Sequence, residues 1–156
     1  AISKKINNVQ IESIEDLTRY SPVAWQNAYI NLGEEFARYF GPQAKGKYLE
    51  NYLEFVNQDS QNHYFWVDRA DVIIIDKTIF LWHRKRLSEQ FNIQQALVFH
   101  DIFDEATHFK VNFKEEAIRN DFNKALAQLR ESGEYQVIVD QYLHTPASDA
   151  PTPNPY

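Results

Sequence analysis

The sequence predicts an α/β fold, with helices on both faces of a mostly parallel sheet. Segments of strand character alternate with segments of helical periodicity along the chain, an arrangement typical of this class. The clearest strand covers 71–76, where four apolar residues follow one another without polar alternation, Val72, Ile73, Ile74 and Ile75. A strand of this composition is covered by protein on both sides, as strands of parallel sheets are.

The first elements are a connector, a turn and a strand. Residues 1–9 are polar and irregular, which favours a connector. A short helical turn is expected over 13–17, because Ser13 can cap it and Asp16 stands at the capping-box position. The apolar segment that follows predicts a strand over 21–26.

The middle of the chain continues the alternation. A helix is expected over 32–40, with Asn31 as its cap and Gly41-Pro42 as its end. Its apolar face holds Leu32, Phe36, Tyr39 and Phe40. The remaining segments are, in order, an ambiguous aromatic strand over 48–56, a short helix over 59–67, the strand over 71–76, a helix over 78–91, and strands over 96–102 and 108–113.

Two helices close the predicted fold. Apolar residues recur at helical spacing over 114–131, namely Ile118, Phe122, Ala125, Leu126 and Leu129. Gly133 is a natural end for this helix. A second stripe follows in Ile138, Val139, Tyr142 and Leu143. Residues 145–156 contain four prolines and little to bury, which favours an extended or disordered tail.

The composition excludes several classes of protein. The 156 residues are 44% hydrophobic and 24% charged, so the chain can bury the core of one domain. No apolar run approaches the ~18 residues of a membrane-spanning helix. The net charge of −6 repels phosphate backbones and argues against binding nucleic acid. The absence of cysteine excludes disulfides, Cys-ligated zinc and thiol catalysis.

Several motifs that suggest chemistry have simpler structural explanations. The segment 41–48, GPQAKGKY, nearly matches a P-loop, but Tyr48 replaces the Ser or Thr that holds Mg²⁺, and a helix precedes it. The basic run 83–86 is explained by one solvated helical turn. Five potential metal ligands lie close in sequence and fit an acidic, solvated turn better than a metal site, His100, Asp101, Asp104, Glu105 and His108.

No pattern indicates an enzyme. The chain has no G-x-S-x-G elbow, and nothing joins its Ser, His and Asp residues into a triad. The pairs Glu34-Glu35 and Glu115-Glu116 each open a helix, where acids favour the dipole. Adjacent helical positions do not face each other, so neither pair makes an acid/base dyad.

Asp76 is the strongest candidate site residue. It ends a buried apolar strand, at the edge of the sheet where α/β proteins bind ligands. A carboxylate there needs a partner, solvent or a cation. An N-cap for the helix that follows explains Asp76 equally well, because a helix cap and a binding site occupy the same place.

Four stretches, taken together, resemble a known family. They are Ile14-Glu15-Asp16-Leu17, the strand and loop PVAWQNA over 22–28, the strand ADVIIID over 70–76, and a carboxy-terminal block from Phe122 through Gly133-Glu134-Tyr135 to Tyr142. Their order and type, over about 8–144, resemble the family 3 extracellular solute-binding proteins. These are the type 2 periplasmic binding proteins of polar amino acid ABC importers.

The resemblance implies a protein of two lobes that closes on a solute. Residues 1–9 would be a connector, 10–103 the second lobe, 104–144 the return strand and closing helices of the first lobe, and 145–156 a tail. Most of the first lobe, with the family's carboxylate-binding arginine, would then be missing. The apolar stripes of the closing helices would be left open, which predicts self-association.

The resemblance also implies a site and a location. Asp76 matches the aspartate that pairs with the α-amino group of the ligand, and Gln26, Asn27 and Tyr29 fall on the loop that lines the cleft. The family usually has Gly-Thr where this chain has Ala28-Tyr29, which favours an aromatic or unusual solute. We expect a periplasmic importer component without a cofactor, whose partners are a small polar solute and the membrane subunits. A sensory module and an enzyme on the same fold are the alternatives.

Overall fold

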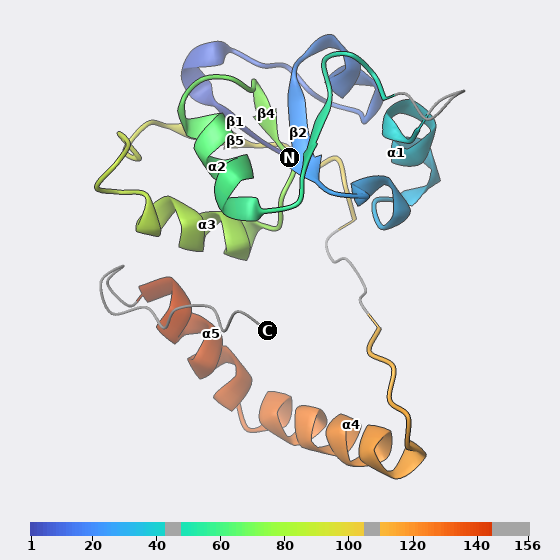
Figure 1. Ribbon diagram of the computed structural model, residues 1–156. Helices are drawn as coiled ribbons and strands as arrows, with labels where there is room; N and C mark the ends of the chain where they lie inside the picture. The colour runs from blue at the N-terminus through green and yellow to red at the C-terminus, as the bar shows by residue number, and fades with distance from the viewer. Residues whose placement is uncertain (43–47, 105–109, 145–156) are drawn as a thin grey trace. The chain divides into compact units, whose positions relative to one another are not determined.

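The computed structural model describes residues 1–42, 48–104 and 110–144 (Figure 1). It divides the chain into two compact units, Ala1–Thr107 and His108–Tyr156.

The first unit is built on a five-stranded sheet with the strand order β3-β2-β4-β1-β5. β2 runs parallel to both β3 and β4, whereas β1 runs antiparallel to β4 and β5. The α/β class is therefore confirmed, and the sheet is mostly parallel, with β1 alone running against the other four strands. The strands are β1 (Ile2–Lys4), β2 (Pro22–Trp25), β3 (Leu53–Phe55), β4 (Val72–Ile73) and β5 (Leu97–Phe99).

The expected connector over 1–9 is wrong, because its first residues lie inside the sheet. β1 pairs with β4 on one side and β5 on the other, and Ile2, Ser3 and Lys4 are all buried. A short 3-10 helix, η1 (Lys5–Asn7), follows the strand. The pattern is misleading because two of the three strand residues are polar, and their partners lie far away in sequence.

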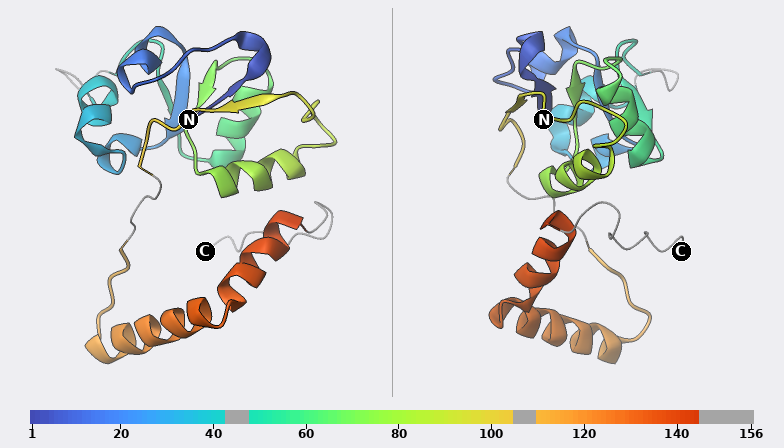
Figure 2. Two further views of the ribbon diagram at one scale, coloured as in Figure 1. Left: turned by 180° about the vertical axis from the view of Figure 1, so that it is seen from behind. Right: turned by 90° about the vertical axis from the view of Figure 1, so that its left-hand side faces the viewer.

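Helical segments cover both faces of this sheet. They are η2 (Glu15–Arg19), η3 (Ala28–Ile30), α1 (Gly33–Phe40), α2 (Gln58–Trp66) and α3 (Lys77–Arg86). α1, η2 and η3 belong to one face, and α2 and α3 lie together on the other (Figures 1 and 2). The apolar run over 72–75, which begins with β4, alternates between the two cores, with Val72 and Ile74 on the α1 side and Ile73 and Ile75 on the α2 side. The prediction that this strand is covered on both sides is confirmed.

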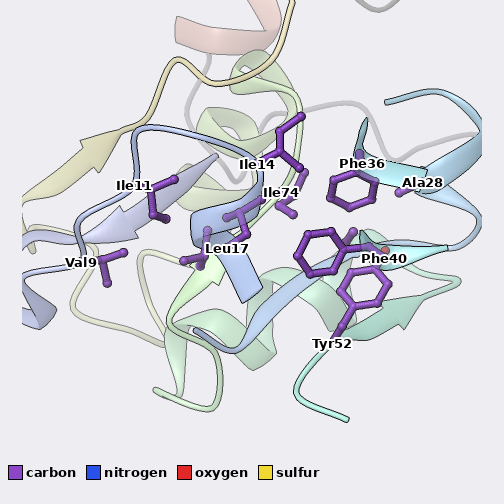
Figure 3. Packing of buried hydrophobic residues seen from close by; sticks show 11 residues of the cluster. Val9, Ile11, Ile14, Leu17, Ala28, Phe36, Phe40, Tyr52 and Ile74 are labelled. Atoms are coloured by element: carbon purple, nitrogen blue, oxygen red, sulfur yellow. The ribbon is translucent and has the colours of Figure 1, made fainter. Parts of the chain in front are cut away.

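The core on the α1 side is aromatic. Phe36 and Phe40 are fully buried and stacked, with ring centroids 4.7 Å apart. The ring of Tyr52 meets both of them, at 6.1 and 5.1 Å. Figure 3 shows these three rings gathered beside Ala28 and opposite Ile14 and Ile74. The helical face predicted from the sequence therefore packs onto the sheet.

The ends of three helices differ from expectation. α1 has Leu32 rather than Asn31 at its N-cap position, with no side-chain cap. α2 is capped by Asn57, whose Oδ1 accepts the N–H of Asp59. α3 ends at Arg86 instead of residue 91, and the buried Leu87 is its C-cap residue.

The second unit is a helical hairpin, α4 (Glu116–Glu131) and α5 (Glu134–His144). Gly133 joins the helices at φ +80°, a left-handed conformation that favours glycine. Residues 110–113 form no strand, so that part of the expected strand over 108–113 is wrong, while 108 and 109 lie outside the described residues. The tail over 145–156 also lies outside them.

The hairpin exposes much of its apolar stripe. Leu126, Leu129 and Val139 are half-buried, whereas four other side chains are exposed, Ile118, Phe122, Ile138 and Tyr142. Self-association through this surface stays a prediction. Among the described residues, neither of these helices nor any other is both long and apolar enough to cross a membrane.

Candidate functional site

The candidate site lies at the edge of the sheet where β2 and β4 end. The two strands are adjacent and parallel, with Val23 opposite Ile73. The backbone therefore leaves the sheet at the same edge after each of these two strands. Gln26 follows the last residue of β2, and Asp76 follows the last residue of β4 by three positions. This edge is where open α/β sheets bind ligands.

Asp76 is exposed and caps α3. Its Oδ1 accepts the N–H of Ile79 at 3.0 Å, and its carbonyl accepts the N–H of Phe80 at 2.9 Å. No hydrogen bond within the described part of the chain engages its Oδ2. Lys77 does not neutralise it, because the Lys77 ammonium lies over the ring of Phe99 at 5.3 Å. The N-cap role is therefore present, and it leaves a carboxylate oxygen open to solvent.

The loop after β2 presents two amide side chains. Gln26 and Asn27 are exposed, and Asn27 has a left-handed backbone at φ 60°. Ala28 then turns into the core, where it is fully buried. Tyr29 is half-buried and lies 6.5 Å from the ring of Tyr48. The rings of Tyr29 and Tyr48 thus add aromatic surface beside the loop.

Glu54 holds this loop in place, a role that the sequence does not predict. Its Oε2 accepts the N–H of Asn27, and its Oε1 accepts the hydroxyl of Tyr52, both at 2.9 Å. Burial and then the hydrogen bond to Glu54 raise the pKa of Tyr52 far above its ordinary value, so the phenol remains a neutral donor. The sequence shows Glu54 only as one of two acids within the aromatic segment 48–56, and its partner is defined by the pairing of β2 with β3.

Gln61 joins the two strands of the site from beneath. This fully buried side chain on α2 donates through Nε2 to the carbonyls of Val23 and Ile74, at 3.1 and 2.9 Å. These two hydrogen bonds hold α2 against β2 and against the residue that follows β4. The sequence gives no signal for this role, since a glutamine within a polar helix is ordinarily exposed.

The other sequence motifs contribute no site within the described residues. The P-loop-like segment falls mostly on 43–47, outside those residues. Glu105 and His108 of the acidic turn also lie outside them, and the described residues hold no group of three His, Cys, Asp or Glu side chains that could bind a metal. His100 Nε2 is instead 2.8 Å from the hydroxyl of Ser3, beneath β1.

Two buried histidines make stability depend on pH. His83 Nδ1 lies 3.0 Å from Oδ1 of Asp59, and burial lowers the pKa of His83 despite that carboxylate. Burial likewise lowers the pKa of His100, and it lowers the pKa of the Ala1 amino group to about 6. In each case the unfolded chain binds a proton more readily than the folded chain. Stability is therefore complete above the unfolded pKa values and is lost as the pH falls through the folded ones.

We therefore expect the urea midpoint to be lower at about pH 5.5 than at about pH 7.5. Replacing both buried histidines with glutamine should reduce this difference. An NMR titration of the imidazole resonances of the unchanged chain checks the cause directly. A midpoint that is constant or rises on acidification would contradict the assignment.

Comparison with known proteins supplies no relative for this site. No protein-family model, curated protein or solved structure matches the chain. The resemblance to family 3 solute-binding proteins stays a prediction.

Proposed function

We propose that this chain forms a ligand-binding lobe of a type 2 solute-binding protein that serves an ABC importer. The solute is an amino acid or a similar small polar molecule that carries an amine. The observation that supports this most strongly is the parallel pairing of β2 with β4, which brings the loop over 26–29 and Asp76 to one edge of the sheet. The importer's membrane subunits and a periplasmic location belong to the same proposal.

Each side chain has a distinct task in this proposal. Asp76 accepts a hydrogen bond from the solute's ammonium group through Oδ2, because Oδ1 is committed to the helix cap. Gln26 and Asn27 supply amide donors for the polar groups of the solute. Tyr29 supplies an apolar wall, which favours a solute with an aromatic or apolar part. Glu54 holds the backbone of Asn27 in place.

Replacing Asp76 with asparagine tests this role without removing the helix cap. Asparagine and aspartate cap helices about equally well, so the stability should change little. The lost charge-assisted hydrogen bond should weaken the binding of an amine-bearing amino acid by about 10- to 100-fold. Affinity is measured by titrating the chain with a panel of free amino acids and following its amide resonances. The resemblance implies a second wall to the cleft, so we expect this lobe alone to bind weakly.

Glu89→Gln is a matched control, because it removes one negative charge from an exposed position that follows α3. This variant should bind like the unchanged chain. If Asp76→Asn binds as tightly as Glu89→Gln, Asp76 is a helix cap alone and the proposed role in binding is wrong.

A further inference from the structure

A cavity lies away from the proposed site, between α2 and the end of α3. Its volume is about 480 Å³. The side chains that matter here are Ser60, His63 and Tyr64 on α2, Arg69 in the turn that follows, and Arg86 at the end of α3. Neither Asp76 nor the loop over 26–29 contributes to this cavity. A ligand bound here would therefore be independent of the proposed function.

The charges around this cavity are not balanced. One carboxylate, Asp59, lies among them, and its Oδ1 is already approached by Arg86 Nη1 at 3.3 Å and His83 Nδ1 at 3.0 Å. Arg69 makes no ion pair with any described residue. An unneutralised guanidinium at a cavity of a chain with net charge −6 is a local reversal of sign. It attracts anions to this place.

The backbone that carries Arg69 is held in place. The Arg69 N–H donates to the carbonyl of Tyr64 at 3.2 Å, which closes the turn after α2. The preceding Asp68 has a left-handed backbone at φ 59°, and its Oδ1 accepts the buried ammonium of Lys4 at 2.5 Å. The Arg69 guanidinium lies 5.9 Å from the centroid of the Tyr64 ring. A guanidinium on such a fixed turn binds an oxyanion at a lower cost in entropy.

Aromatic surface accompanies the positive charge. The rings of Phe55 and Tyr64 both line the cavity and lie 5.3 Å apart. The hydroxyl of Ser60 and the imidazole of His63 add hydrogen-bonding groups at the same wall. Planar guanidinium groups match the geometry of carboxylates and phosphates. The combination suits a ligand that has an oxyanion at one end and a flat ring at the other.

We propose that this cavity binds a small aromatic oxyanion, with Arg69 as the residue that holds the anionic group. The shared chemistry is an aryl carboxylate or an aryl phosphate ester. Arg86 remains paired with Asp59 and shapes the opposite wall, supported by its own stacking on Trp82 at 4.5 Å.

The test uses the full chain and three probes: phenyl phosphate, benzoate and the neutral benzyl alcohol. In a titration followed by amide chemical shifts, either anion should perturb residues of α2 and 86–90, and benzyl alcohol should perturb them far less. Tighter binding of phenyl phosphate assigns the site to phosphate esters, and tighter binding of benzoate assigns it to carboxylates. Equal perturbation by all three probes, or none at these residues, would overturn the proposal.

Two variants with the same loss of charge identify the residue. Arg69→Gln should weaken the binding of the preferred anion by about tenfold or more. Arg119→Gln on α4 removes a guanidinium that pairs with Glu116 elsewhere on the surface, and it should leave the affinity unchanged. Equal weakening by both variants would reduce the effect to net charge and overturn the assignment to Arg69. Binding of amino acids at Asp76 should be the same in both, which separates this test from that of the proposed function.

Discussion

Replacing Phe36 with alanine should lower the free energy of unfolding of the first unit by about 3–5 kcal/mol. Phe36 is fully buried on α1, stacks on Phe40 and meets the edge of the Phe103 ring at 5.7 Å. Its removal leaves a cavity in the core that supports the loop over 26–29. Chemical denaturation followed by far-UV circular dichroism measures the loss.

Phe99→Ala is the control for this substitution. It deletes the same atoms from a ring that is 39% exposed on the edge strand β5. The ring of Phe99 buries less apolar area than the ring of Phe36. Its removal should therefore lower the free energy of unfolding by well under half as much. Equal costs at the two positions would show that the packing on the α1 side contributes less than described.

Lys4→Ala should lower the free energy of unfolding of the first unit by about 3 kcal/mol, more than the loss of any other charged residue there. The side chain is fully buried in β1, and its ammonium donates to the Trp66 carbonyl at 3.1 Å and to Asp68. The ammonium also lies 5.3 Å from the centroid of the Phe65 ring. Alanine removes the charged hydrogen bonds and the packed methylene stem together.

Two comparisons separate these contributions. Lys4→Met keeps an apolar stem of similar length and should cost less than Lys4→Ala, because Asp68 is 67% exposed and water can solvate its charge. Lys5→Ala changes the neighbouring exposed lysine and should alter the stability by no more than about 0.5 kcal/mol. If Lys4→Ala resembles Lys5→Ala, the buried lysine does not anchor the turn after α2.

The parts of the fold that could be predicted are those defined by local pattern. The unbroken apolar run over 72–75 indicates a strand covered on both sides, and the spacing of Phe36 and Phe40 indicates the buried face of α1. Both features depend on residues that lie within about four positions of each other in the sequence. They hold because burial of apolar side chains is the dominant driving force of folding.

The parts that could not be predicted depend on distant partners. β1 is too short and too polar to signal a strand. Lys4 is buried against Trp66 and Asp68, partners that follow it by 62 and 64 residues in the sequence. The antiparallel direction of β1 makes the sheet mixed, and no local pattern specifies that direction. Over 110–113, alternating residues form no strand because strand propensity is realised only when a partner strand is present.

The residues of the candidate site also fall into some that the sequence could place and some that it could not. Asp76 and the loop over 26–29 could be placed at one edge, because each follows an apolar strand and parallel strands end together. Glu54 and Gln61 could not be found, since each acts on backbone groups of a neighbouring strand. Asp76 shows why pattern alone leaves two explanations open, since its side chain caps α3 while one oxygen remains open to solvent.

The central claim is that solute binds where β2 and β4 end. Amide chemical-shift mapping of the isotope-labelled chain during titration with amine-bearing amino acids tests it most directly. We predict that the perturbed resonances cluster at 26–30 and 76–79. In the Asp76→Asn variant these shifts should be suppressed, while its spectrum without ligand shows an intact fold. Perturbations confined to other parts of the chain, or none with any amino acid in the panel, would contradict it.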